Sequence, residues 1–140
     1  MYEPIRAKSV HSTMAGTSQD VPRRSREEEL DIQLAGHLGT LLAVTDELRA
    51  VAPSSDLDAA AERLAEQVTR LRGGRKPARA SATTQGRDPN AAALHRRAHA
   101  LSGRALVVAA SRADTAAAIL AAERMDAHSA ALQPRELTSR

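Results

Sequence analysis

The sequence predicts an all-α protein in which an antiparallel helical hairpin packs against a long C-terminal helix. This is a three-helix bundle, or a four-helix bundle if the last helix breaks near residues 111–114. Three observations predict this class. Ala, Leu, Arg and Glu, which are strong helix formers, dominate the chain. Leu and Ala recur at steps of three and four residues, the spacing of one helix face. Gly and Pro gather at a few points that separate these stretches.

The composition allows one domain with a thin core. The chain has 140 residues, of which 30 are Ala, whereas Leu, Ile and Val together supply 25 and Phe and Trp are absent. Cysteine is also absent, which excludes disulfides, thiolate zinc sites and cysteine nucleophiles. Such a chain forms helices more readily than it buries them, so we expect self-association to supply further burial.

The charge of the chain is nearly balanced, because 20 basic residues face 17 acidic ones and leave a formal net charge of +3. This excess does not by itself indicate a nucleic-acid partner. No run of 18 apolar residues is present, and the N-terminus lacks the apolar block of a secretory signal. We therefore expect no membrane partner and a cytoplasmic location.

The first helix is expected at about residues 26–52. Ser25 and Glu28 have the spacing of a capping box, and further acidic residues in this turn favour a helix start. Apolar residues then form one stripe that ends before Pro53: Leu30, Leu34, Leu38, Leu41, Leu48 and Ala52. Residues 1–24 show no sustained period and predict a disordered N-terminal tail.

The second helix is expected at about residues 55–72. Ser54, Ser55 and Asp56 are its N-cap candidates, and Gly73–Gly74 would end it. The short connection makes the two helices antiparallel neighbours whose apolar stripes face each other. Residues 73–88 are rich in Gly, Pro, Ser, Thr and Arg, which predicts a flexible basic linker.

The third helical stretch covers residues 90–132, with Asp88 as its expected N-cap, Pro89 at the first helical position, and a C-terminal tail at 133–140. It is either a single helix or two helices divided near Ser111–Asp114, where Asp114 could cap the second. We prefer the single helix, because residues 111–114 contain no Gly or Pro on which to turn.

The histidines are the candidate ligand residues. His95 and His99 stand four residues apart, so both imidazoles share a helix face and could bind a divalent ion. Two ligands are not a site, and we expect an exposed pair with no metal or other cofactor. His37 falls on the apolar stripe of the first helix. We expect it to be partly buried and hydrogen-bonded, with a ligand or a pH-sensitive element at an interface as the alternative.

Basic residues around the linker form the second candidate site. They could contact phosphates, but no aromatic residues are interleaved to stack bases, so a solvated loop is the preferred interpretation. The residues are Arg70, Arg72, Arg75, Lys76, Arg79 and Arg87.

Arg112 conflicts with its surroundings, because on a continuous helix it shares the apolar face of Leu94 and Leu101. We expect it to reach solvent past the end of the hairpin, with its methylene stem along the stripe. The alternatives are an ion pair with Asp46 or Glu47, or a break in the helix.

No phosphate-binding glycine loop, nucleophile elbow or carboxylate–histidine arrangement is present, so we predict no catalytic residues and no enzyme activity. The predicted function is a helical protein-interaction or structural module whose partner is a second copy or another helical protein. One alternative is a small nucleic-acid-associated regulator that uses residues 70–87. Another is a metal-dependent enzyme that uses His37, His95 and His99.

Overall fold

The structure is a computed structural model that describes residues 7–79 and 90–133, with side chains from Ser25 onward. It contains four α-helices: α1 (Ala7–Val51), α2 (Ser55–Leu71), α3 (Ala91–Arg112) and α4 (Thr115–Ala131). The described residues contain no strand. The predicted all-α class is therefore confirmed, in its four-helix form.

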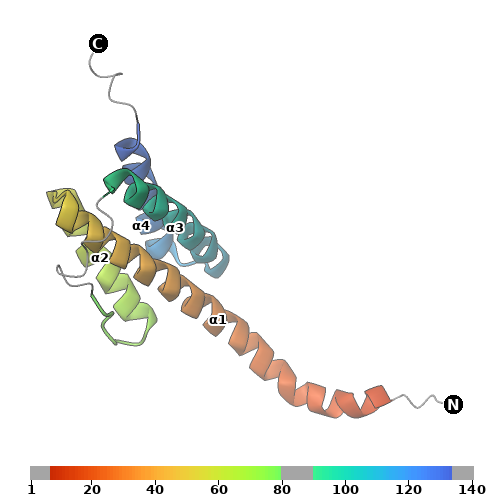
Figure 1. The fold of residues 1–140 in the computed structure, drawn as a ribbon. Coiled ribbons are helices and arrows are strands. Elements are labelled where there is room, and N and C mark those ends of the chain that lie inside the picture. The colour runs from red at the N-terminus through yellow and green to blue at the C-terminus, as the bar shows by residue number, and fades with distance from the viewer. Residues whose placement is uncertain (1–6, 80–89, 134–140) are drawn as a thin grey trace.

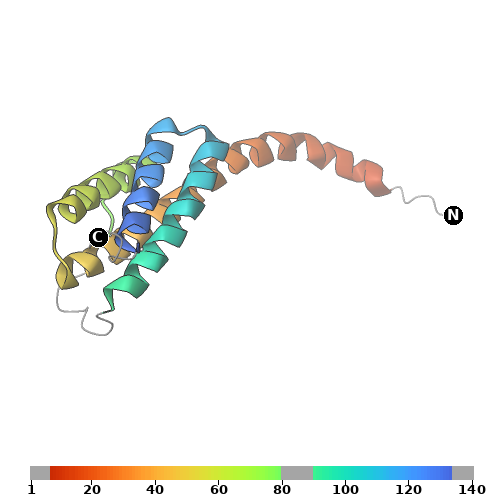
Figure 2. The same ribbon diagram turned by 90° about the horizontal axis from the view of Figure 1, so that it is seen from above.

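The helices form a bundle in which each helix lies antiparallel to its neighbours (Figures 1 and 2). α1 packs against α2 and α3, α3 packs against α4, and α4 contacts α2. Two ion pairs show this for α2 and α4, because Arg70 near the end of α2 meets Asp114 at the start of α4, whereas Asp56 at the start of α2 meets Arg124 in the second half of α4. The chain therefore runs one way in α1 and α4 and the other way in α2 and α3.

We call the two ends of the bundle the exit end and the far end. The exit end is where α1 leaves the bundle, α3 ends and α4 begins, near Asp31 and Asp114 (Figure 1). The far end is where α1 and α4 end and α2 and α3 begin. After α2 finishes at the exit end, the described residues 72–79 lead back along α1 as far as Asp46, with which Arg79 pairs.

The core is made of leucine on α1 and largely of alanine on α3 and α4. The middle of the predicted apolar stripe of α1 is buried against the stripe of α2, which confirms the hairpin, whereas Leu30 at the start of the stripe is half-buried and Ala52 at its end is exposed. Alanine allows helix axes to approach closely, so a chain without Phe or Trp can still fill its interior. The buried residues of α1 and α2 include Leu34, Leu38, Leu41, Leu48, Leu57, Leu64 and Val68, and those of α3 and α4 include Ala98, Ala105, Ala109, Ala117 and Ala121.

Side-chain caps begin three of the helices. The Leu57 amide donates to the Ser54 hydroxyl at the start of α2, which confirms one of the predicted caps. The end of α2 also follows the prediction, because Gly73 and Gly74 both adopt positive φ. At α3 the cap is Asn90, whose side chain accepts from the Ala93 amide. The predicted cap Asp88 lies outside the described residues.

The start of α1 differs from the prediction. The helix begins at Ala7 and continues through the stretch that the sequence analysis assigned to a tail. A capping box contributes only about 1 kcal/mol to a helix start and does not stop a helix that arrives from the N-terminal side. Figures 1 and 2 show this part of α1 curving away beyond the other three helices.

The preference for one long C-terminal helix was wrong, and the alternative division at residues 111–114 is correct. Ala113 adopts a left-handed conformation with φ 60°, and Asp114 caps α4 by accepting from the Ala117 amide. A left-handed alanine costs about 1–2 kcal/mol. The turn offsets this cost because it buries the apolar faces of α3 and α4 against each other, including Ala105 and Leu120.

The predicted linker is described up to Arg79. Residues 75–79 follow α2 without helical structure, and Arg79 makes an ion pair with Asp46 of α1. Arg87 and the rest of the linker lie outside the described residues. Among the helices that the structure describes, none has the length and apolar character needed to cross a membrane.

Candidate functional site

A buried histidine pair lies at the far end of the bundle. Nδ1 of His95 on α3 is 2.9 Å from Nδ1 of His128 on α4, and the ring centroids are 5.1 Å apart. One of the two nitrogens must carry the proton and donate, while the other accepts. His128 is fully buried and His95 is half-buried. The bond therefore requires at least one neutral imidazole.

The surroundings keep both rings neutral. Burial, the positive charge of Arg124 and the neighbouring His95 lower the pKa of His128 to about 4. Burial and then the charge of Arg124 also lower the pKa of His95. Both imidazoles are therefore uncharged at neutral pH.

Arg124 on α4 brings a charge into this cluster, although only 3% of the residue is exposed. Its Nη1 atom is 3.2 Å from a carboxylate oxygen of Asp56, which is largely exposed, and its Nη2 atom is 3.4 Å from Nε2 of His128. Its Nε atom is buried without a hydrogen-bond partner among the described residues. A buried guanidinium with incomplete pairing is costly, so this cluster limits the stability of the fold.

The expectation that His95 and His99 form an exposed pair was wrong, because α4 packs against α3 and leaves both half-buried. The sequence pattern did not indicate His128, Arg124 or Asp56 as members of this cluster. The four-residue spacing of Arg124 and His128 indicates that they share a helix face. That face meets His95 only because the chain turns back at residue 113, which the spacing does not predict. Among the residues that the structure describes, the cluster contains no nucleophile next to a base, and Asp56 is the one acidic partner of its basic groups. It can hold a charge in place, but nothing in its geometry indicates catalysis.

The structure does not assemble the three histidines of the metal alternative. His99 is half-buried on the same helix as His95, whereas half-buried His37 lies on α1 toward the exit end. Within the described ranges, no three His, Cys, Asp or Glu residues form a group that could hold a metal ion. No hydrogen bond joins His37 to another described residue, so only the partial burial of its prediction is seen.

Two of the basic residues near the linker are engaged with carboxylates. Nη2 of Arg70 lies 2.9 and 3.1 Å from the two oxygens of Asp114. Arg79 donates to both oxygens of Asp46 at 2.9 Å. Burial raises the pKa of Asp46, but the hydrogen bonds from Arg79 and Arg49 outweigh burial and leave that pKa below its ordinary value. These arginines are therefore neutralised within the chain.

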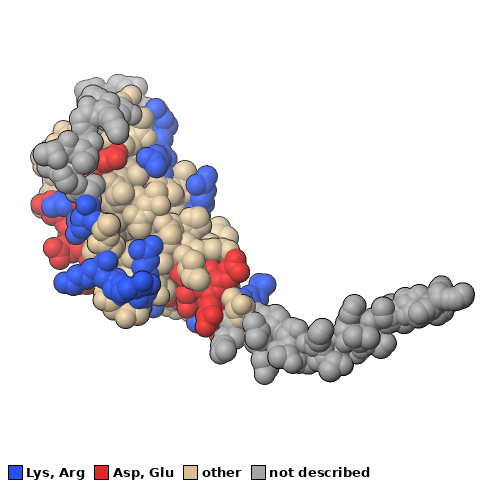
Figure 3. Space-filling model, turned by 60° about the horizontal axis from the view of Figure 1, so that its bottom comes forward, with Lys and Arg blue, Asp and Glu red and all other residues tan. Residues whose placement is uncertain are grey.

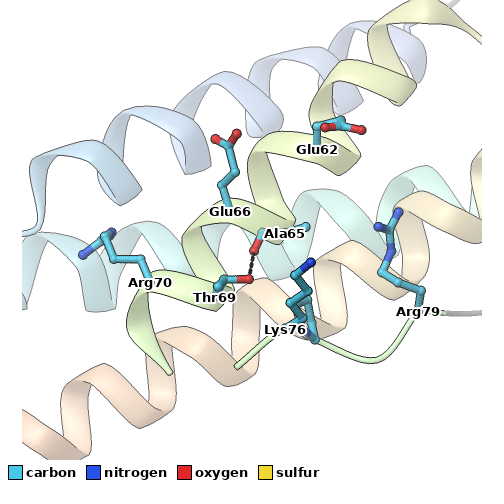
Figure 4. A pocket seen from close by; sticks show the side chains of 8 residues that line it. Glu62, Ala65, Glu66, Thr69, Arg70, Lys76 and Arg79 are labelled. Carbon is cyan, nitrogen blue, oxygen red and sulfur yellow. Dashed lines mark hydrogen bonds between the residues drawn. The ribbon is translucent and has the colours of Figure 1, made fainter. Parts of the chain in front are cut away.

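The remaining described basic residues of this set, Arg72, Arg75 and Lys76, are exposed. Lys76 lines a cleft of about 510 Å³ between α2 and the start of the linker, which Glu62 and Glu66 also line (Figure 4). Figure 3 likewise shows basic side chains next to acidic ones on this side of the molecule. The mixed charge does not resemble a surface that attracts phosphates alone.

Arg112 is the last residue of α3 and lies beside the break between α3 and α4. A break at this residue was one of the alternatives for it. Its Nε atom is 3.0 Å from Asp31 of α1, and about a third of each side chain is exposed. The pairing with an acid of α1 was foreseen, but with the wrong acids. Asp46 and Glu47 lie toward the far end, because α1 and α3 are antiparallel.

Large apolar side chains are exposed at the exit end. The exposed fraction is 71% for Ile32 on α1, 66% for Val107 on α3 and 53% for Ile119 on α4. A shallow groove of about 270 Å³ lies between the end of α3 and the start of α4. Its lining is almost entirely apolar and consists of Ala109, Ala110, Ala113, Asp114, Thr115, Ala118, Ile119 and Ala122.

The chain was compared with models of protein families, with curated proteins and with solved structures, and none of the three comparisons gave a match. Its function is therefore inferred from its own residues.

Proposed function

We propose that this protein is a helical interaction module that associates with a second copy of itself. The observation that carries the proposal is the length of α1. The helix begins at Ala7, but its first buried residue among those with described side chains is Leu34. Leu30 is already half-buried and Asp31 pairs with Arg112 of α3, so the part of α1 outside the bundle is residues 7–29, about 33 Å of helix at 1.5 Å per residue (Figures 1 and 2).

A helix without tertiary contacts is marginally stable in water, because its hydrogen bonds barely offset the entropy of ordering the backbone. Packing against another surface removes this weakness. The exposed Ile32 at the base of the extension and the apolar groove between α3 and α4 are suitable contact surfaces, because both keep apolar area in water.

Multi-angle light scattering over a concentration series tests the proposal with the full chain. The mean mass is expected to rise from that of one chain to that of two as the concentration increases through the micromolar range. A mass of one chain at every concentration up to about 1 mM would contradict self-association, because a dissociation constant above about 1 mM corresponds to a binding free energy weaker than about 4 kcal/mol.

The nucleic-acid alternative stays a prediction that no observation on the described residues favours, since Arg70 and Arg79 are already paired with carboxylates. Retention of the protein on duplex DNA at low salt, lost steeply toward physiological salt, would support it. The cytoplasmic location also stays a prediction from the sequence.

A further inference from the structure

Where α1 enters the bundle, its exposed face carries an acidic residue one helical turn before an apolar residue. Glu28 and Ile32 are four residues apart and both exposed, so they share a face of the helix. The neighbouring Glu27 and Glu29 are exposed as well, which makes this turn strongly negative. Within the described ranges, Glu28 forms no ion pair.

The outer face of α3 carries the complementary order of charge and apolar surface. Arg97, Arg104 and Val107 lie at helical spacing and are all exposed. Neither arginine has an ion-pair partner among the described residues. Val107 is followed one turn later by Ala110, which lines the apolar groove shared with Ile119 of α4. Along this face, basic residues therefore come first and apolar residues follow toward the exit end.

The two faces match when the helices lie side by side in the same direction. The step from Glu28 to Ile32 on α1 spans about 6 Å, and the step from Arg104 to Val107 on α3 about 4.5 Å, both at 1.5 Å per residue. Apolar contacts one turn beyond a charge pair would therefore align with little shift. Within one chain, α1 and α3 run antiparallel and are already joined at this end by Asp31 and Arg112.

We infer that the extended part of α1 from one copy docks along the outer face of α3 in a second copy. Ile32 lies against Val107 and the groove around Ile119, and Glu28 lies opposite Arg104. This inference rests on the proposed self-association and adds the surface through which it occurs. In a two-fold symmetric dimer the contact is made twice, so each substitution affects two contacts.

A charge-reversal cycle on the full chain tests the contact. Glu28→Arg and Arg104→Glu are each expected to weaken dimerisation about tenfold or more, because each places like charges opposite each other. The combination of both reversals restores opposite charges and should bring the dissociation constant back toward that of the original chain. Glu66→Arg, the same change on exposed α2, is the matched control and should have no effect.

Cysteine cross-linking gives a second measurement, because the chain has no cysteine of its own. A chain with Ile32→Cys and Val107→Cys should form a disulfide-linked dimer whose linked peptides contain positions 32 and 107. The variant with Ile32→Cys and Glu66→Cys is the control and should not form the corresponding link between positions 32 and 66.

The outcomes separate the inference from the proposed function. If the original chain stays monomeric, both fail. If it dimerises but neither reversal changes the dissociation constant, or if the 32–107 link forms within one chain, the docking surface is wrong and self-association stands. If Arg104→Glu removes binding to nucleic acid while dimerisation is unchanged, the basic face of α3 serves nucleic acid, and the inference is overturned.

Discussion

His128 and His95 share a single hydrogen bond in the interior, and this bond makes the fold sensitive to acid. Protonating both rings would remove the acceptor and place two more positive charges next to Arg124. Among the side chains that the structure describes, the one acid in this cluster is Asp56, which is bonded to Arg124. Both histidines are evident in the sequence, but their pairing depends on which helices face each other, and the spacing of residues within one helix does not determine that.

The free energy of unfolding should therefore fall below neutral pH. The pKa of His128 is about 4 in the fold and about 6.5 when unfolded, so the unfolded chain binds more protons between these values. The stabilisation is complete above pH 6.5 and is lost as the pH falls toward 4, by up to about 3 kcal/mol. Urea unfolding at pH 7, 5.5 and 4 measures this loss.

His128→Leu is the control for this prediction, because it leaves an apolar side chain of similar volume in the same place. Its free energy of unfolding should vary less between pH 7 and 4 than that of the original chain. An equal loss in both chains would show that other groups cause the acid sensitivity.

Arg112 illustrates how a single residue was only partly predicted. The preferred outcome was a residue on a continuous helix that only reaches solvent, and it missed both the break, which was one of the alternatives, and the ion pair with Asp31. Half-exposed ion pairs contribute at most about 1 kcal/mol. We therefore expect Arg112→Leu to change the free energy of unfolding by less than about 1 kcal/mol in a thermal melt, whereas a loss above about 3 kcal/mol would indicate a buried pair.

At the scale of the elements, apolar periodicity predicted α2 and the bundle part of α1 well, because their stripes are also their buried faces. Local signals failed where tertiary packing decided. The alanine-rich sequence around residue 113 favours a continuous helix, yet the chain reverses there because α3 and α4 then bury their apolar faces against each other. The start of α1 was predicted too late, at residue 26 and not at Ala7. Residues 7–25 have only a weak apolar pattern, but a weak pattern does not prevent a helix.

Ala113→Gly tests the break directly. Glycine adopts φ 60° without the steric cost that alanine has, so this substitution should raise the free energy of unfolding by about 0.5–1 kcal/mol. In a continuous helix the same change would lower it by about 1 kcal/mol. The sign of the change in a urea titration therefore distinguishes the two structures.

Asp114 secures the same turn from the other side, because it caps α4 and pairs with Arg70. Asp114→Ala removes both interactions and is expected to lower the free energy of unfolding by about 1–2 kcal/mol. Asp126→Ala, an exposed acid in the middle of α4, serves as the control and should cost less than about 0.5 kcal/mol. Equal effects of the two substitutions would show that the cap contributes little.

At the scale of the whole molecule, the sequence predicted a chain with more helix than core, and the structure places the excess at one end. The bundle buries its leucines, while α1 continues past it and exposed apolar residues remain around the exit end. The composition indicated that burial was scarce, but it contained no information on where the unburied surface would lie. Only the arrangement of the helices locates it.

Amide hydrogen exchange of α1 at low and high protein concentration is the most direct test of association through the extended helix. Amides of residues 7–29 are expected to exchange quickly in dilute protein and to become protected at concentrations where the dimer forms, while amides of the bundle part, such as Leu38, change little. If residues 7–29 exchange at the same rate at both concentrations although the mass doubles, association does not involve this part of α1.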